Sequence, residues 1–200
     1  MNITKGSATR QTILAHAGLL ATQIGLEGVT IGRLADDLDL SKSGLFAHFR
    51  SKEELQMQTI EHQRQRFVDL VVRPTLDAPG GAPRVQKLFE RWMAWRAEQP
   101  GGCFFAAASF ELDDRPGPVR DRIAELQSEW LRTIARIAET AIKRGHFRAD
   151  LDTDLWAHEF YGMMLSYHLA DRLLRDPGAI ARVHRSFEQL LARSRAAAVA

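Results

Sequence analysis

Apolar residues recur every three or four positions along almost the whole chain of 200 residues. The clearest case is the stretch 118–144, where Val119, Ile123, Leu126, Trp130 and Ile134 follow this spacing. Such a period places the apolar side chains on one face of an α-helix. No stretch rich in valine or isoleucine lies between hairpin turns. We therefore expect an all-α fold class with about nine helices.

Three helix-start signals fall close together in the amino-terminal part of the sequence. Thr30 and Ser41 each precede a short apolar pattern and can cap a helix, and Ser51 with Glu54 forms an S-x-x-E capping box. Upstream, Gly25 follows a striped segment at 9–24 and supplies a left-handed C-terminal cap. The resulting order over 9–55 is helix, short helix, turn, short helix and capped helix. This order is that of a three-helix head with a helix-turn-helix motif.

The second short helix, at 42–49, is predicted to present a small outer face. If Leu45 and Phe49 point into the core, the step of 100° per residue turns Ser43 and Ala47 outward, with Gly44, Phe46 and Arg50 beside them. A small face lets a helix lie deep in the major groove of DNA, where hydroxyl groups and apolar atoms can read base edges. The pattern therefore favours sequence-specific DNA binding.

Positive charge is concentrated at this same place, although the whole chain has a formal net charge of only +2. The segment 41–52 contains Lys42, Arg50 and Lys52 and no acidic residue. These side chains can neutralise DNA phosphates and release counterions. The exposed N–H groups of the helix starts at Thr30 and Ser41 can hold further phosphates. A basic stretch that is simply a solvated surface remains the alternative interpretation.

The segment GLEGVTIGRLADDLDLSKSGLFAHFRSKEEL resembles the amino-terminal DNA-binding head of the TetR family of bacterial transcriptional regulators. The specific resemblance covers about residues 9–55, and the remainder matches only in architecture. It implies a DNA-binding domain at 1–55 and a helical ligand-binding and dimerisation domain at 56–200. It further implies a repressor that binds a palindromic operator as a homodimer and is released by a small-molecule inducer.

The resemblance also assigns roles to eight residues of the head. There are two departures from the family pattern: Asp39 stands where many relatives have glycine, and Phe46 where many have tyrosine. The turn at Asp39 is therefore expected to be strained, and one hydroxyl-to-phosphate bond is lost. Phe46 can alternatively pack against the protein. The assigned roles are phosphate contacts for Thr30 and Lys52, contacts to bases or backbone for Ser41, Lys42, Ser43 and Ala47, and the groove edge for Phe46 and His48.

Large aromatic side chains are spread over the predicted helices of the carboxy-terminal part. Pockets between bundled helices are commonly apolar with a few polar groups, so some of these aromatics are candidates for lining a ligand site. Plain core packing is the competing interpretation, because aromatic residues at helical spacing are usually core. The sequence does not identify the ligand. The candidate ligand-binding residues are Trp92, Phe105, Trp130, Trp156 and Tyr161.

The last two predicted helices are the expected dimer interface. One short head offers few base contacts, so useful affinity requires two heads held at a fixed spacing by a symmetric dimer. One helix carries the stripe Trp156, Phe160, Met163 and Tyr167, and the other carries Ile180, Val183, Phe187 and Leu190. Packing within one subunit explains these stripes as well.

Enzyme and metal-site motifs find little support, so we expect no enzyme activity and no cofactor. The sequence has no H-E-x-x-H, no glycine-rich phosphate loop and no G-x-S-x-G. Its only cysteine, Cys103, lies in an apolar run, where an inert buried thiol is expected and a redox role is a separate hypothesis. Asp150, Asp152 and Asp154 resemble the opening of a calcium loop, but the glycine and glutamate that such a loop needs are absent, which favours helix capping. Besides a DNA-binding regulator and an enzyme, the third functional class is a helical adaptor that does not bind DNA.

The sequence also indicates the compartment. A single cysteine excludes an internal disulfide and suits a reducing environment. The first residues, MNITKGSATR, are polar, and no apolar run approaches the roughly 18 residues that span a bilayer. We therefore expect a cytoplasmic protein that does not enter the membrane.

Overall fold

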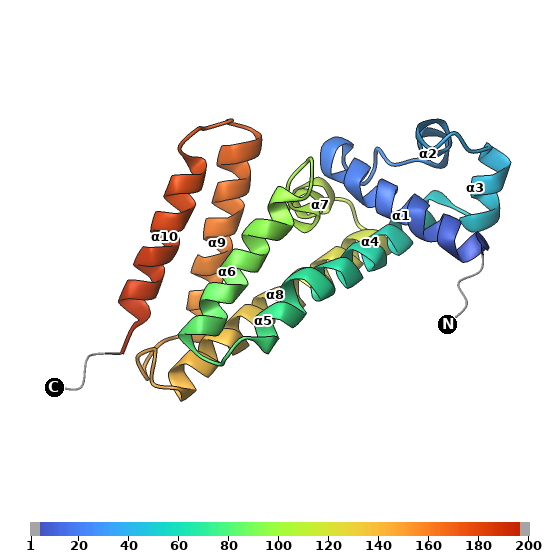
Figure 1. Cartoon of the computed structure of the whole chain (residues 1–200). Helices are drawn as coiled ribbons and strands as arrows, with labels where there is room; N and C mark the ends of the chain where they lie inside the picture. Colours follow the sequence, from blue (N-terminus) through green and yellow to red (C-terminus); the bar gives the residue numbers. More distant parts are fainter. Residues whose placement is uncertain (1–4, 197–200) are drawn as a thin grey trace. The chain divides into compact units, whose positions relative to one another are not determined.

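The computed structural model describes residues 5–196, and this part of the chain is all-α, as the periodicity predicts (Figure 1). The helical segments Lys52–Phe67, Val68–Val72 and Arg73–Asp77 follow one another without a break, so the ten α-helical segments of the described range form nine continuous helices. The only β feature there is an isolated antiparallel bridge between Phe147 and Arg195. The helices are α1 (Lys5–Ile24), α2 (Ile31–Asp37), α3 (Lys42–His48), α4 (Lys52–Phe67), the π-helical turn η1 (Val68–Val72), α5 (Arg73–Asp77), α6 (Ala82–Ala97), α7 (Phe104–Leu112), α8 (Pro118–Lys143), α9 (Thr153–Arg172) and α10 (Ala179–Ser194).

The three predicted helix caps are all present. Thr30 Oγ1 accepts a hydrogen bond from the N–H of Arg33 at 3.1 Å, and Ser41 Oγ accepts one from Gly44 at 3.1 Å. Ser51 Oγ accepts from the N–H of Glu54 at 3.0 Å. Each side chain thereby satisfies one of the free donors at a helix start. Local sequence alone is thus sufficient to place the starts of α2, α3 and α4.

Pro74 lies inside a continuous helix, although proline usually breaks or kinks one. The backbone stays helical through η1 and α5 as far as Asp77. Proline removes the hydrogen bond to the carbonyl four residues earlier, here that of Leu70. That carbonyl instead accepts a hydrogen bond from Arg91 Nε at 2.7 Å, and it lies within the wider π-helical turn, which ends two residues before the proline. A partner from α6 therefore replaces the lost bond and lets the helix continue.

The described chain forms two compact units, and the first contains the predicted head. It combines residues up to Val68 with the segment Arg96–Ala124. Within it α1 packs against α4 and α7, and α2 packs against α3. The second unit combines Asp69–Trp95 with the chain from Glu125 onward. A functional division at residues 55 and 56 stays a prediction, whereas the contacts attach α7 to the head.

Close backbone packing joins α1 to the turn that precedes α7. The N–H of Gly101 donates to Thr22 Oγ1 at 2.9 Å, and this hydrogen bond is buried. A Cβ atom at Gly101 would lie only 1.7 Å from the carbonyl oxygen of Thr22. Only glycine allows the two backbones to approach this closely. The amino-terminal head is therefore built partly from a segment about eighty positions further along the chain, as the contacting positions 22 and 101 show.

In the second unit, α9 and α10 pack side by side (Figure 1). Phe187 stacks on Phe89 of α6 with ring centroids 4.1 Å apart and meets Phe160 of α9 edge-on at 5.9 Å. Val183 and Leu190 are buried on the same face of α10. These stripe residues form the core of one chain, which is the alternative that the sequence left open. Ile180, by contrast, is 55% exposed.

Candidate DNA-binding site

The orientation predicted for α3 is confirmed. Leu45 and Phe49 are fully buried, with 0% exposure, while Ser43 and Ala47 are exposed on the opposite side. Phe46 is 55% exposed, so it does not pack into the interior. The helix therefore turns a face of small side chains and one aromatic ring to the solvent.

Thr30 at the start of α2 and Lys42 at the start of α3 both lie near Gly32. A Cβ atom built at Gly32 in the first turn of α2 would lie 3.9 Å from Lys42 Cε and 4.0 Å from Thr30 Oγ1. At the start of α3, Ser43 Oγ donates to Ser41 Oγ at 3.3 Å. The starts of α2 and α3 thus bring exposed hydroxyl groups and a lysine near Gly32.

The cations of this region differ in their surroundings. Lys42 and Arg50 are exposed, and neither side chain makes an ion pair with the part of the chain that the structure describes. Lys52 instead donates to Glu27 Oε2 with an Nζ to oxygen distance of 2.9 Å. His48 is half-buried, and its ring centroid lies 6.2 Å from that of Phe49. Lys42 and Arg50 are therefore available to anions, whereas Lys52 already has a counter-ion.

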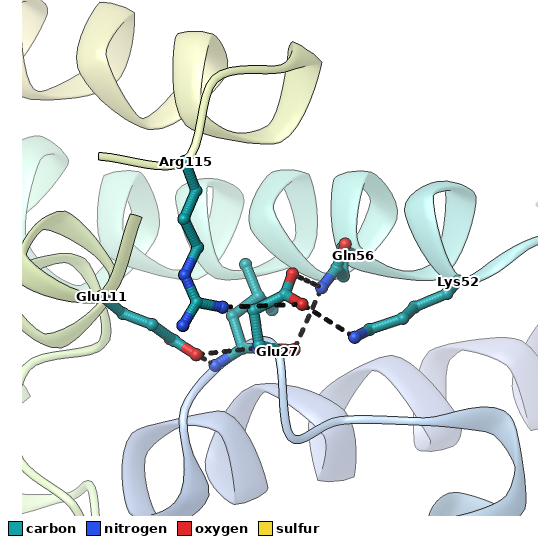
Figure 2. A network of polar contacts seen from close by, with 6 residues as sticks. Glu27, Lys52, Gln56, Glu111 and Arg115 are labelled. Atoms are coloured by element: carbon teal, nitrogen blue, oxygen red, sulfur yellow. Dashed lines mark hydrogen bonds and ion pairs between the residues drawn. The ribbon is translucent and has the colours of Figure 1, made fainter. Parts of the chain in front are cut away.

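The counter-ion of Lys52 belongs to a polar network that the sequence analysis missed (Figure 2). Glu27, in the loop between α1 and α2, also accepts a hydrogen bond from Gln56 Nε2 at 2.7 Å. Arg115 Nη1 lies 3.8 Å from the same Glu27 oxygen that Lys52 contacts. The hydrogen bonds from Lys52 and then Gln56 hold the pKa of the Glu27 carboxyl below its usual range. Glu27 is therefore ionised at neutral pH.

The backbone beside Glu27 is held by a second carboxylate, that of Glu111 on α7. Its Oε2 accepts the N–H of Leu26 at 2.7 Å, and its Oε1 accepts the N–H of Glu27 at 2.9 Å. Gly25, with φ of 79°, makes room for it, because a Cβ there would lie 2.4 Å from Glu111 Oε1. The contacts span 84 and 85 positions, so no local pattern could reveal them.

Three of the five candidate ligand-binding aromatics are buried in the second unit. Trp92 is 1% exposed and Trp130 is 9% exposed. Trp156 stacks on Phe160 at 5.1 Å, and its Nε1–H donates to Ser194 Oγ at 2.9 Å. The polar atom of Trp156 is thus already satisfied within the packed pair α9 and α10. A ligand-lining role for these three residues remains a prediction.

The other two candidates are half-buried and belong to different units. Tyr161 of α9 donates its hydroxyl hydrogen to Gln127 Oε1 of α8 at 2.8 Å. Phe105 of α7 meets Phe67 at the end of α4 edge-on, with ring centroids 5.6 Å apart. Phe105 lies in the first unit, and Tyr161 lies in the second. For these two residues as well, a role in ligand binding stays a prediction.

The alternative sites behave as ordinary structural features. Asp152 caps α9, where its Oδ1 accepts the N–H groups of Asp154 at 3.0 Å and Leu155 at 2.9 Å. Cys103 is buried, with 4% exposure. Over residues 5–196 no group of three or more potential ligands could hold a metal ion. No helix in that range is both long and apolar enough to span a bilayer.

Comparison with known families identifies the family of the chain. Residues 13–56 match the model of the bacterial regulatory proteins of the tetR family, and residues 81–187, over half of the chain, match that of the tetracyclin repressor-like C-terminal domain. The chain belongs to the TetR family. Its members are DNA-binding transcriptional regulators rather than enzymes, so α2 and α3 form the helix-turn-helix of a regulator.

Solved TetR-family structures share this fold over nearly their whole length. A regulator from Chloroflexus aurantiacus is 24% identical, with a TM-score of 0.83 over 96% of this chain and 99% of its own. One from Cytophaga hutchinsonii is 19% identical, with a TM-score of 0.83 over 98% of both chains. One from Agrobacterium tumefaciens is 16% identical, with a TM-score of 0.83 over 96% and 100%. The comparison with curated proteins finds no match.

Proposed function

We propose that this TetR-family regulator is a cytoplasmic homodimeric repressor that binds a palindromic operator and is released from it by a small-molecule inducer. The observation that carries the proposal is the exposed face of α3, where small side chains lie beside Lys42 and Arg50, which make no ion pair with the described part of the chain. A major groove about 12 Å wide admits such a helix. Membership of the family supports the rest of the proposal.

Eight residues of the head have a proposed role. Ser43 and Ala47 approach base edges, where a hydroxyl group can donate or accept and a methyl group can contact thymine. Lys42 binds a phosphate, since its ammonium group has no carboxylate partner in the described chain. Ser41 contacts the backbone, Thr30 and Lys52 contact phosphates, and Phe46 and His48 line the edge of the groove.

We place the subunit contact on the outer face of α9. Its central residues are small, Gly162 and Ser166, and leucines 155, 169 and 173 flank them. In a regular helix these five positions lie within about 60° of one another, opposite the buried stripe. Leu173 is 73% exposed, and a Cβ at Gly162 would meet nothing within 4 Å. Close helix packing between two copies requires an apolar face with small residues at its centre.

Lys42→Ala tests the phosphate contact. We expect weaker binding to every duplex, and a slope of log affinity against log salt that is smaller by about 0.9, because one phosphate contact is lost. Lys143→Ala, at an exposed lysine near the end of α8, removes the same charge and should leave the slope unchanged. Fluorescence anisotropy with a labelled duplex measures both. Equal slopes for Lys42→Ala and the unaltered protein would remove Lys42 from the interface.

Selection of bound fragments from random DNA tests the operator. A dimer with two matched heads should enrich a palindrome whose half-sites lie about one helical turn apart. Ser43→Ala should then change base preference rather than the salt slope, because a hydroxyl group carries no charge. A selected set without palindromic symmetry would contradict the proposed dimeric reading of DNA.

Leu169→Glu tests the subunit contact. A carboxylate on the apolar face of α9 should convert dimers to monomers, because burying an unpaired charge is costly. Leu76→Glu is the matched control, since Leu76 on α5 is 48% exposed and Leu169 is 50% exposed. Light scattering after size exclusion gives the mass of each variant. A dimeric Leu169→Glu protein would place the interface elsewhere.

Thermal-shift screening followed by anisotropy tests the inducer. A ligand that binds only the folded protein stabilises it by about 2.7 kcal/mol at a concentration one hundred times its dissociation constant. An inducer must also bind the DNA-free form better than the DNA-bound form. We therefore expect hits that raise the melting temperature and weaken binding to the selected duplex. Stabilising ligands that leave DNA affinity unchanged would contradict release by an inducer.

A further inference from the structure

The carboxylate of Glu27 faces two cations at once. Lys52 Nζ lies 2.9 Å from Glu27 Oε2, and Arg115 Nη1 lies 3.8 Å from the same oxygen (Figure 2). Lys52 opens α4 in the DNA-binding head, whereas Arg115 follows the end of α7. One cation therefore makes a direct hydrogen bond, and the other stands just beyond hydrogen-bond distance.

Arg115 is held within reach by the local structure. Its N–H donates to the carbonyl of Leu112 at 3.0 Å, in the last turn of α7. One residue before Leu112, Glu111 is tied to the loop that carries Glu27 through its two backbone hydrogen bonds. The side chain of Arg115 is 57% exposed, which leaves its guanidinium group free to approach the carboxylate further.

We propose that Glu27 is an exchangeable counter-ion: it holds Lys52 in the absence of DNA, and Arg115 takes it over when Lys52 turns to a phosphate. Arg115 is then a positioning residue for DNA binding that does not touch the duplex. The inference rests on the proposed phosphate contact of Lys52.

The physical reason is the charge that Lys52 leaves behind. Without a replacement cation, the transfer of Lys52 would leave an unpaired carboxylate near a dense line of phosphates, within about one Debye length of 8 Å to 10 Å. Arg115 Nη1 lies 3.8 Å from Glu27 Oε2, and a move to hydrogen-bond distance lets Arg115 neutralise that carboxylate. Such an exposed pair contributes up to about a five-fold change in an equilibrium constant.

Four proteins test the exchange: the unaltered chain, Arg115→Gln, Glu27→Gln and the double variant. Fluorescence anisotropy with a labelled mixed-sequence duplex gives affinities between about 50 mM and 200 mM salt. Arg115→Gln should weaken binding about three-fold, and Glu27→Gln should strengthen it about two-fold. In the Glu27→Gln background, Arg115→Gln should have no effect, because the carboxylate that Lys52 leaves behind is no longer there.

Salt dependence separates a positioning role from a direct contact. Arg115→Gln should keep the slope of the unaltered protein, whereas a lost phosphate contact lowers the slope by about 0.9. Arg120→Gln is the matched control, since Arg120 in the first turn of α8 pairs with Asp121. It should leave affinity and slope unchanged, and thermal melting should show that all variants remain folded.

Each outcome decides a different statement. A loss of affinity on Arg115→Gln that is equal in both backgrounds, or a slope lowered by about 0.9, would overturn the exchange while leaving the proposed function intact. A Lys52→Gln variant with an unchanged slope would overturn both the phosphate contact of Lys52 and the exchange. No duplex binding by the unaltered protein at low salt would refute the proposed function itself.

Discussion

Gly25, which directly follows α1, offers the sharpest test of how the loop between α1 and α2 is held. Gly25 has a φ of 79°, and a Cβ at this position would lie 2.4 Å from Glu111 Oε1. Gly25→Ala therefore combines two costs. The left-handed backbone costs about 1–2 kcal/mol for a residue with a side chain. Displacement of Glu111 from the backbone N–H groups of Leu26 and Glu27 costs about 1–3 kcal/mol more.

We expect Gly25→Ala to lower the free energy of unfolding by about 2–5 kcal/mol, the sum of these two costs. Urea denaturation followed by circular dichroism measures this free energy. Gly145→Ala calibrates the first cost alone, because Gly145 also has a positive φ, 69°, but nothing lies within 4 Å of its Cβ position. That variant should lose only about 1–2 kcal/mol.

The second cost can be isolated with Glu111→Ala. Once the carboxylate is absent, Gly25→Ala has only its backbone cost to add, so its effect should fall to about 1–2 kcal/mol. The difference between the two backgrounds measures the coupling of Gly25 to Glu111. If Gly25→Ala costs the same in both, the carboxylate does not hold the loop.

Three further variants test separate features. The amide of Gln63 is fully buried without a hydrogen-bond partner among the described residues, so Gln63→Met should raise the free energy of unfolding by about 1–3 kcal/mol in urea denaturation; a loss would mean that the amide is bonded. Asp39 has a φ of 53°, so Asp39→Gly should stabilise by about 0.5–1 kcal/mol and Asp39→Ala should not, and the opposite order would refute strain at this turn. The hydrogen bond from Lys52 lowers the pKa of Glu27, so this pair stabilises the fold fully above the ordinary pKa of 4.5 and loses its effect as pH falls through the lowered value. Glu27→Gln should therefore flatten this part of a curve of unfolding free energy against pH, and an unchanged curve would contradict the pairing.

The sequence predicted those parts of the head that depend on neighbours a few positions away. The caps at Thr30, Ser41 and Ser51 each bond an N–H three residues later. The outward turn of Ser43 follows from the helical period once Leu45 is known to be buried. Such features need no knowledge of the rest of the fold.

What the sequence did not predict involves partners that are distant along the chain. The helix passes Pro74 because Arg91 supplies a donor for the carbonyl of Leu70, 21 positions away. Glu111 likewise reaches a loop 84 positions earlier. Periodicity showed that Phe187 is buried but could not decide whether the covering surface belonged to the same chain. The structure gives that answer through the stacked ring of Phe89.

The discontinuous make-up of the first unit has a consequence for engineering hybrid regulators. An exchange that grafts residues 1–55 onto the effector part of a relative would strip the graft of Gly101 and Glu111, and with them two anchors of the α1 terminus. The grafted DNA-binding helices would then pack against a segment of another protein that lacks the glycine needed for the close backbone approach. A chimera of this protein should therefore carry positions 96–124 along with the head. The first compact unit contains both segments, although they are separated along the chain.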